Sequence, residues 1–209
     1  MIKRVLMVAL VLSMLSVAML PGTALAKNNN ENPRETRFTA TAQLAVVNGG
    51  EVEATPIGEN FILQKTTGEM VAGEVLSSKK WPEIAGAQIL FIHESRTIMN
   101  LRSNKITGTA VGTILIGKIN ADYTGMAEVW MQGNYRALIR GSFTLDGEET
   151  PVIYDKIFDA ARFDLEGVGY GFEGVSASGR GLAKLTWQEV NPPGIYTLAG
   201  PMLLNGTYK

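Results

Sequence analysis

Residues 135–146 read YRALIRGSFTLD and show the clearest alternation in the chain. Apolar or small side chains occupy every second position, namely Ala137, Ile139, Gly141, Phe143 and Leu145. The positions between them are mostly polar, namely Arg136, Leu138, Arg140, Ser142, Thr144 and Asp146. A period of two is that of a β-strand with one buried face. This stretch therefore predicts a strand in a sheet that covers a core on one side only.

Arg136 and Arg140 share a face of this predicted strand. They would be solvated if that face is the outer one, and anion-binding groups if it faces an enclosed lumen. The outer face is favoured, because the opposite face carries large apolar side chains.

The same alternation recurs in twelve segments along the chain, which predict ten or so strands. They are expected over 38–46, 60–66, 69–76, 86–93, 95–101, 105–119, 123–132, 135–146, 161–166, 181–190, 195–198 and 202–208. Glycine-containing pairs at 67–68, 133–134 and 200–201 predict hairpin turns. Only residues 151–161 have spacing that fits a helical turn or two. The chain is therefore expected to be all-β, with a single antiparallel β-barrel over 37–209 and at most one short helix.

The N-terminus predicts export. Lys3 and Arg4 precede an apolar run over 5–20, and Pro21–Gly22 and the small residues of Ala24–Leu25–Ala26 follow it. This is the pattern of a secretory signal peptide. Cleavage is expected after Ala26, with 1–26 as signal peptide and 27–36 as a disordered linker. The protein is expected to be secreted, periplasmic or at the cell surface, without stable membrane insertion after cleavage.

Composition excludes several kinds of site. The chain has no cysteine, which removes disulfides, thiolate metal sites and a cysteine nucleophile. The formal net charge is −1 and like charges form no block, so no electrostatic footprint for nucleic acid is present. A single histidine cannot make a three-histidine zinc site. No cofactor, metal or nucleic acid is therefore expected.

The segment GYGFEG, residues 169–174, has the spacing of a dinucleotide-binding loop. Such a loop needs a buried strand before it and a helix beginning within it. Here an alternating strand precedes the glycines, and no helical periodicity follows them. We instead expect a strand through 167–172, with Gly167, Gly169 and Gly171 on one face and Val168, Tyr170 and Phe172 on the other.

His93, Glu94 and Tyr170 are weak candidates for acid–base chemistry, because each could exchange a proton with a substrate in a pocket. His93 follows the apolar run AQILFI and is expected at a strand end near the rim of the sheet, where an ordinary hydrogen-bonded role is favoured. No G-x-S-x-G nucleophile elbow is present.

Three stretches, 38–63, 108–119 and 161–187, resemble the allene oxide cyclase and dirigent-like barrel superfamily. The resemblance is carried by alternation and by glycines at the end of a strand, here Gly167, Gly169, Gly171, Gly174 and Gly179. It implies an antiparallel barrel of about eight strands, often oligomeric and with an apolar cavity. The expected barrel is therefore either allene oxide cyclase-like or calycin-like. Plant members cyclise a fatty-acid epoxide or guide phenoxy-radical coupling. None of their polar cavity residues matches a position here, so no catalytic residue is carried over.

Three functions remain open at this point. The first is a non-catalytic exported barrel that binds a small apolar ligand in or at its lumen. The second is a cell-surface structural or interaction domain with a packed core. The third is a cofactor-free cyclase or isomerase of the allene oxide cyclase type. A homo-oligomer is compatible with each of them.

Overall fold

The structure is a computed structural model that describes residues 34–146, 150–190 and 195–209. Nine antiparallel strands form one sheet, in the order β1-β9-β8-β7-β6-β5-β4-β3-β2. The elements are β1 (Thr36–Asn48), β2 (Glu51–Gly58), β3 (Phe61–Lys79), the 3-10 helix η1 (Pro82–Ile84), β4 (Gln88–Asn100), β5 (Lys105–Ile119), β6 (Met126–Asp146), β7 (Thr150–Gly167), β8 (Ser176–Val190) and β9 (Ile195–Tyr208). The expected signal peptide and cleavage site lie outside the described residues.

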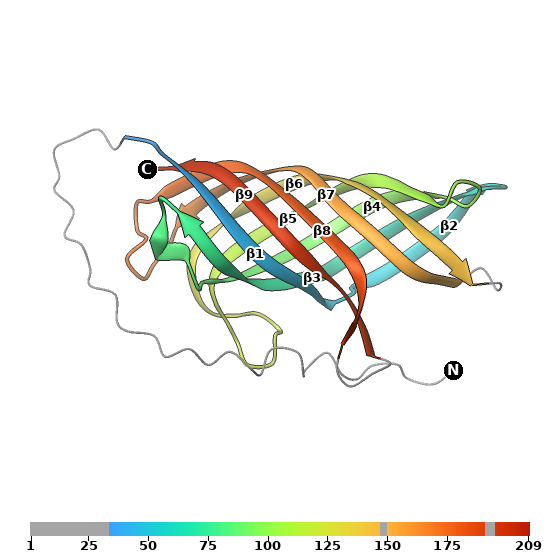
Figure 1. The fold of residues 1–209 in the computed structure, drawn as a ribbon, viewed down its shortest axis with the longest axis horizontal. Coiled ribbons are helices and arrows are strands. Elements are labelled where there is room, and N and C mark those ends of the chain that lie inside the picture. The colour runs from blue at the N-terminus through green and yellow to red at the C-terminus, as the bar shows by residue number, and fades with distance from the viewer. Residues whose placement is uncertain (1–33, 147–149, 191–194) are drawn as a thin grey trace.

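The sheet closes on itself. Strand β1 pairs with β9 along one edge and with β3 along the other, so the hydrogen-bonded ladders form a ring. Strand β2 lies along the first part of β3, beyond the end of β1, and therefore shares one position in the ring with β1. Figure 1 shows the strands winding obliquely around an elongated barrel. The all-β, antiparallel barrel expected from the sequence is confirmed.

The strands are longer and fewer than the sequence predicts. Strand β3 runs through the expected turn at 67–68, where a bulge shifts the register between Thr66 and Glu69. Strands β4, β6 and β9 likewise run through the breaks expected near residues 94, 133 and 200. At Gly133 a Cβ would collide with the carbonyl oxygen of Asp164 on β7, so this glycine permits close strand contact and makes no turn. Strand β2 was not predicted at all.

Two further expectations are wrong. The helical turn expected over 151–161 is part of β7, which pairs with β6 and β8. A bulge between Phe158 and Ala161, with Ala160 at φ 48°, shifts the phase of the alternation and so imitates a longer period. The strand expected through 167–172 ends at Gly167. Gly171 and Gly174 have φ of 88° and 75° and form the link from β7 to β8.

One end of the core is covered by aromatic side chains. Trp81, which precedes η1, is 2% exposed and stacks on Tyr208 with ring centroids 4.5 Å apart. Phe38 meets the same indole edge-on at 4.9 Å. In Figure 1 this end of the barrel also carries the C-terminus. Within the described ranges, no helix has the length and apolar character needed to cross a bilayer.

Candidate functional site

The lumen holds a buried group of charged side chains. Glu69 on β3 and His93 on β4 are directly opposite each other in the strand register, and both point inward. His93 Nε2 lies 2.7 Å from Glu69 Oε2, with the two side chains 1% and 5% exposed. Lys156 reaches the same carboxylate from β7, with Nζ 3.3 Å from Oε1. Because β7 is not a neighbour of β3 in the sheet, this contact crosses the barrel.

The local sequence explains why these groups meet. The bulge before Glu69 brings its side chain into phase with the inward-facing Val71 and Val75. On β5, a Cβ at Gly112 would collide with the backbone of β4 at Ile92 and His93, so the glycine allows β5 to lie close against the histidine. The polar lining of β3 and β4 continues with three buried hydroxyl side chains, those of Thr66, Ser95 and Thr97. Thr66 and Ser95 are directly opposite each other, beside the Glu69–His93 pair.

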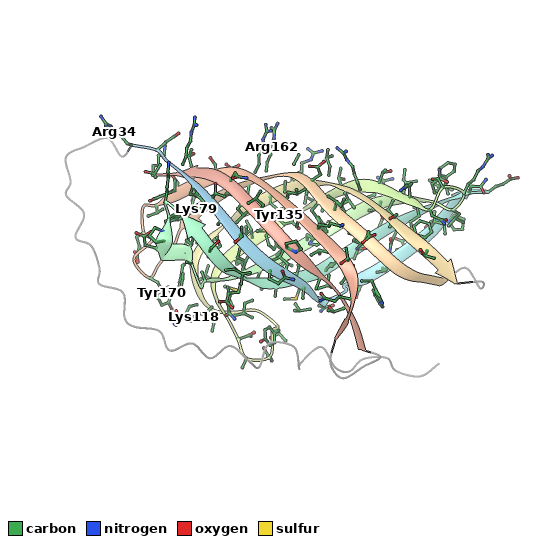
Figure 2. All side chains as sticks on the ribbon, in the orientation of Figure 1. Arg34, Lys79, Lys118, Tyr135, Arg162 and Tyr170 are labelled. Carbon is green, nitrogen blue, oxygen red and sulfur yellow. The ribbon has the colours of Figure 1, made fainter. Side chains whose placement is uncertain are left out.

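Electrostatics favour the ionised form of Glu69. Burial acts to raise the pKa of Glu69, but the hydrogen bond from His93 and the charge of Lys156 outweigh it and lower the pKa below its ordinary value. An ionised carboxylate only accepts hydrogen bonds, so the Nε2–H of His93 is the donor. Burial and the Glu69 charge raise the pKa of Tyr135, whose hydroxyl therefore stays protonated. Figure 2 shows Tyr135 in the middle of the barrel.

The other nitrogen of His93 is unusual. Among the described residues, no group forms a hydrogen bond with the buried Nδ1. In the neutral tautomer that donates Nε2–H to Glu69, Nδ1 carries a lone pair and can accept a proton. The ring is held edge-on between Phe158 and Tyr135, with centroids 5.6 Å and 6.1 Å away. The carboxylate and the two ring contacts together hold the imidazole in one orientation, in which Nδ1 would act as a base when the ring is neutral.

The space beside this base is small. His93 borders a lumen void of about 40 Å³ whose other lining is almost entirely apolar and includes Phe91, Phe158, Phe163 and Met202. A water molecule needs roughly 10–15 Å³ by this kind of measure, whereas ligand pockets typically have about 300–1,000 Å³. The void therefore has room for a few water molecules, but not for a substrate of many atoms.

The three residues singled out from the sequence are not brought together. His93 is in the middle of β4 and faces the lumen, so its expected position at a strand end near the rim is wrong. Glu94 is the next residue and points outward. Tyr170 lies in the link between β7 and β8, with 62% of its surface exposed. Arg136 and Arg140 are exposed on the outside of β6, as favoured from the alternation.

Sequence reasoning missed Glu69 and Lys156. Each is a charged residue at a position in phase with buried apolar neighbours of its own strand, Val71 in one case and Phe158 in the other. A charge on the apolar phase is a signal that could have identified them, provided that the bulges were known. In the described part of the chain, no group of three potential ligand side chains could hold a metal ion.

The outer wall carries larger hollows than the lumen. One of about 580 Å³ extends over β5 to β9 and is lined mainly by polar side chains, namely Gln132, Asn134, Asp164, Glu166, Ser176, Ser178 and Thr207. A second, of about 530 Å³, adjoins it at Thr113 and Asn134 and contains Glu94. Together they form what we call the outer groove. No family model, curated protein or solved structure matches this chain.

Proposed function

We propose that this protein is an exported interaction domain whose barrel is a packed scaffold and whose outer wall binds the partner. The observation that carries this proposal is the filled lumen. Its void of about 40 Å³ is several-fold smaller than the roughly 300 Å³ at the low end of ligand pockets. The second of the three functions considered from the sequence therefore has the better support.

The outer groove is the binding surface in this proposal. Its two hollows of about 580 and 530 Å³ are each in the size range of binding sites. In the strand register, Thr113, Asn134, Asp164, Ser178 and Thr207 are successive cross-strand neighbours, so their polar side chains form a continuous line over five strands. Hydroxyl and amide groups both donate and accept hydrogen bonds, and the carboxylate of Asp164 accepts them, which suits an extended polar partner.

A cysteine-free chain allows a direct test. A Gln132→Cys variant, labelled with a bulky maleimide, places an obstacle in the groove, and a labelled Thr55→Cys variant places the same group on β2, away from it. We expect the first label to reduce co-sedimentation with the cell-envelope fraction of the source organism, after its lipids have been extracted with detergent, and the second to leave it unchanged. Equal co-sedimentation of both labelled proteins would contradict the proposal.

A small apolar ligand in the lumen is a second candidate, favoured by the apolar void that borders His93, whose Nδ1 has no hydrogen-bond partner among the described residues. Such a ligand would have few heavy atoms, or would displace the phenylalanine side chains around the void. Native mass spectrometry after incubation with fatty acids and aromatic alcohols tests this candidate. A stoichiometric adduct would move the function from the outer wall to the lumen.

A cyclase or isomerase function stays a prediction, as does the relation to the allene oxide cyclase and dirigent-like barrels. Of the candidate residues, only His93 has the orientation that proton transfer requires, with Glu69 as its partner. A substrate would reach it only after the lumen had widened. We therefore propose no catalysis by the barrel while its lumen is packed as it is in this structure.

A further inference from the structure

Three arginines form a row on the outside of the barrel. Arg136 on β6 is directly opposite Arg162 on β7, and Arg162 is directly opposite Arg180 on β8. All three are exposed, and Figure 2 shows Arg162 pointing away from the barrel wall. We call these three residues the arginine row. None of the ion pairs among the described residues involves any of them.

This arrangement is unfavourable for the fold. Like charges directly opposite each other on neighbouring strands destabilise a sheet, and here two such pairs occur in succession. The chain as a whole has a formal net charge of −1, so the row is a local concentration of positive charge and not part of a generally basic surface. A binding partner with negative charge would compensate the repulsion.

Exposed leucines lie beside the arginines on the same outer face. Leu138 and Leu182 follow Arg136 and Arg180 by two residues on β6 and β8, and Leu203 on β9 is directly opposite Leu182. Their exposed fractions are 45%, 44% and 38%. We call Leu138, Leu182 and Leu203 the leucine row. It combines large exposed apolar side chains with an adjacent line of cations.

Two carboxylates on β7 lie near this charge without cancelling it. Asp164, two residues from Arg162 on the side of the outer groove, is exposed and forms no ion pair among the described residues. Asp159, opposite Leu138 on β7, forms an ion pair with Arg140 at 3.0 Å. Lys184, two residues beyond Leu182, adds a further exposed cation on β8. The face between the arginine row and Lys184 therefore has an excess of positive charge next to its apolar side chains.

We propose that this face binds the surface of a membrane that contains anionic lipid. The arginines would bind headgroup phosphates through paired N–H donors, and the leucines would enter the boundary between headgroups and acyl chains. A soluble polyanion would account for the arginines but would leave the leucines in water. The barrel lies on the bilayer in this arrangement and does not cross it.

The inference goes beyond the proposed function and uses other side chains. The arginine and leucine rows adjoin the outer groove but do not line it. Membrane binding therefore stands if a label in the groove has no effect, and groove binding stands if vesicles are not bound.

Vesicle co-sedimentation of the full chain tests the proposal. The vesicles contain phosphatidylcholine alone, or phosphatidylcholine with one third phosphatidylglycerol. Because residues 5–20 are themselves apolar, the readout is the ratio of binding to the two kinds of vesicle. Each basic residue near an anionic surface contributes about fivefold in affinity, so replacing the arginine row with glutamine is expected to lower this ratio by about a hundredfold.

Two matched variants make the test specific. The first removes three exposed cations from elsewhere on the barrel, by Lys79→Gln, Arg96→Gln and Lys105→Gln, and is expected to keep most of the ratio. The second replaces the leucine row with threonine and is expected to lower binding to anionic vesicles about tenfold or more. Circular dichroism confirms that each variant is folded.

Three results would overturn the proposal. They are equal binding of the unchanged protein to both kinds of vesicle, equal loss in the control and arginine-row variants, and undiminished vesicle binding by the leucine-row variant. The last result would indicate a site for soluble polyanions, which competition with dextran sulfate would then show.

Discussion

On strands β6 to β8, packing in the lumen explains the residues of the inner face but not those of the outer face. On the inner face Tyr135, Phe163 and Leu185 are almost completely buried and fill the lumen. On the outer face of the same strands, exposed arginines stand directly opposite one another. Neighbours in the sequence such as Arg162 and Phe163 are thus under opposite constraints.

This difference indicates where function resides. Close-packed interiors are sensitive to changes of even one methylene group, and the lumen has almost no spare volume. Repulsive charge on the outside, by contrast, has no benefit for the fold itself. Residues that oppose stability without structural compensation often belong to functional sites. The buried ionic group in the lumen is the exception on the inner face, and it is compensated within the barrel by its own pairing.

The largest effect is expected from the inner face. Phe163→Ala removes a 3% exposed side chain beside the existing void, and it is expected to lower the free energy of unfolding by about 3–5 kcal/mol. Urea denaturation followed by tryptophan fluorescence measures this change. Phe163→Leu keeps most of the volume and is expected to cost less than about 1.5 kcal/mol. Similar small losses for both variants would mean that the lumen is not packed as described.

The next effect concerns the buried charges. Glu69→Gln leaves Lys156 without its anionic partner and is expected to lower the free energy of unfolding by about 3 kcal/mol at neutral pH. Because folding lowers the pKa of Glu69, its contribution is complete above its ordinary value of 4.5 and is lost as pH falls through the lower, folded-state pKa.

The free energies of unfolding of the unchanged protein and of the Glu69→Gln variant should therefore converge as the solution is acidified below pH 4.5. Denaturation curves recorded at a series of pH values give this comparison directly. A difference that is constant over the whole series would show that the charge of Glu69 does not stabilise the fold.

The third effect tests the close approach of the backbones of the neighbouring strands β6 and β7. Gly133→Ala places a methyl group against the carbonyl of Asp164 and is expected to cost about 1–3 kcal/mol. Gly125→Ala is the matched control, because the nearest atom to its Cβ would be 3.9 Å away. Thermal unfolding of both variants should show a clear loss for the first only. Equal melting temperatures would favour the turn at 133–134 that the sequence suggested.

These positions also show what the sequence could and could not predict. Alternation placed Arg136 and Ile139 on opposite faces correctly, because side-chain direction is a local property of a strand. It failed at Gly133, because this position needs a glycine to leave room for the carbonyl oxygen of Asp164 on the neighbouring strand β7. It also failed at the bulges near Glu69 and Ala160, because one extra residue reverses the phase of everything that follows.

The same reasoning explains the candidate site. His93 could be found in the sequence because it is the only histidine, but its partner Glu69 is 24 residues away and Lys156 is 87 residues from Glu69. Only ring closure brings β7 across the lumen from β3. The three arginines are separated in the sequence in a similar way, and their row exists only in the register of three strands.

The smallest effect is expected on the outer face, and its sign is reversed. Arg162→Thr removes both like-charge pairs in the arginine row and is expected to raise the free energy of unfolding by about 0.2–1 kcal/mol. The gain should decrease at high salt, which screens exposed charges. Arg37→Thr, at a position opposite Thr207, is the control that changes the same residue type without relieving a pair. Urea denaturation at low and high salt compares the two. If Arg162→Thr were instead destabilising, the arginine would have a structural role, and the outer face would follow the same rule as the lumen.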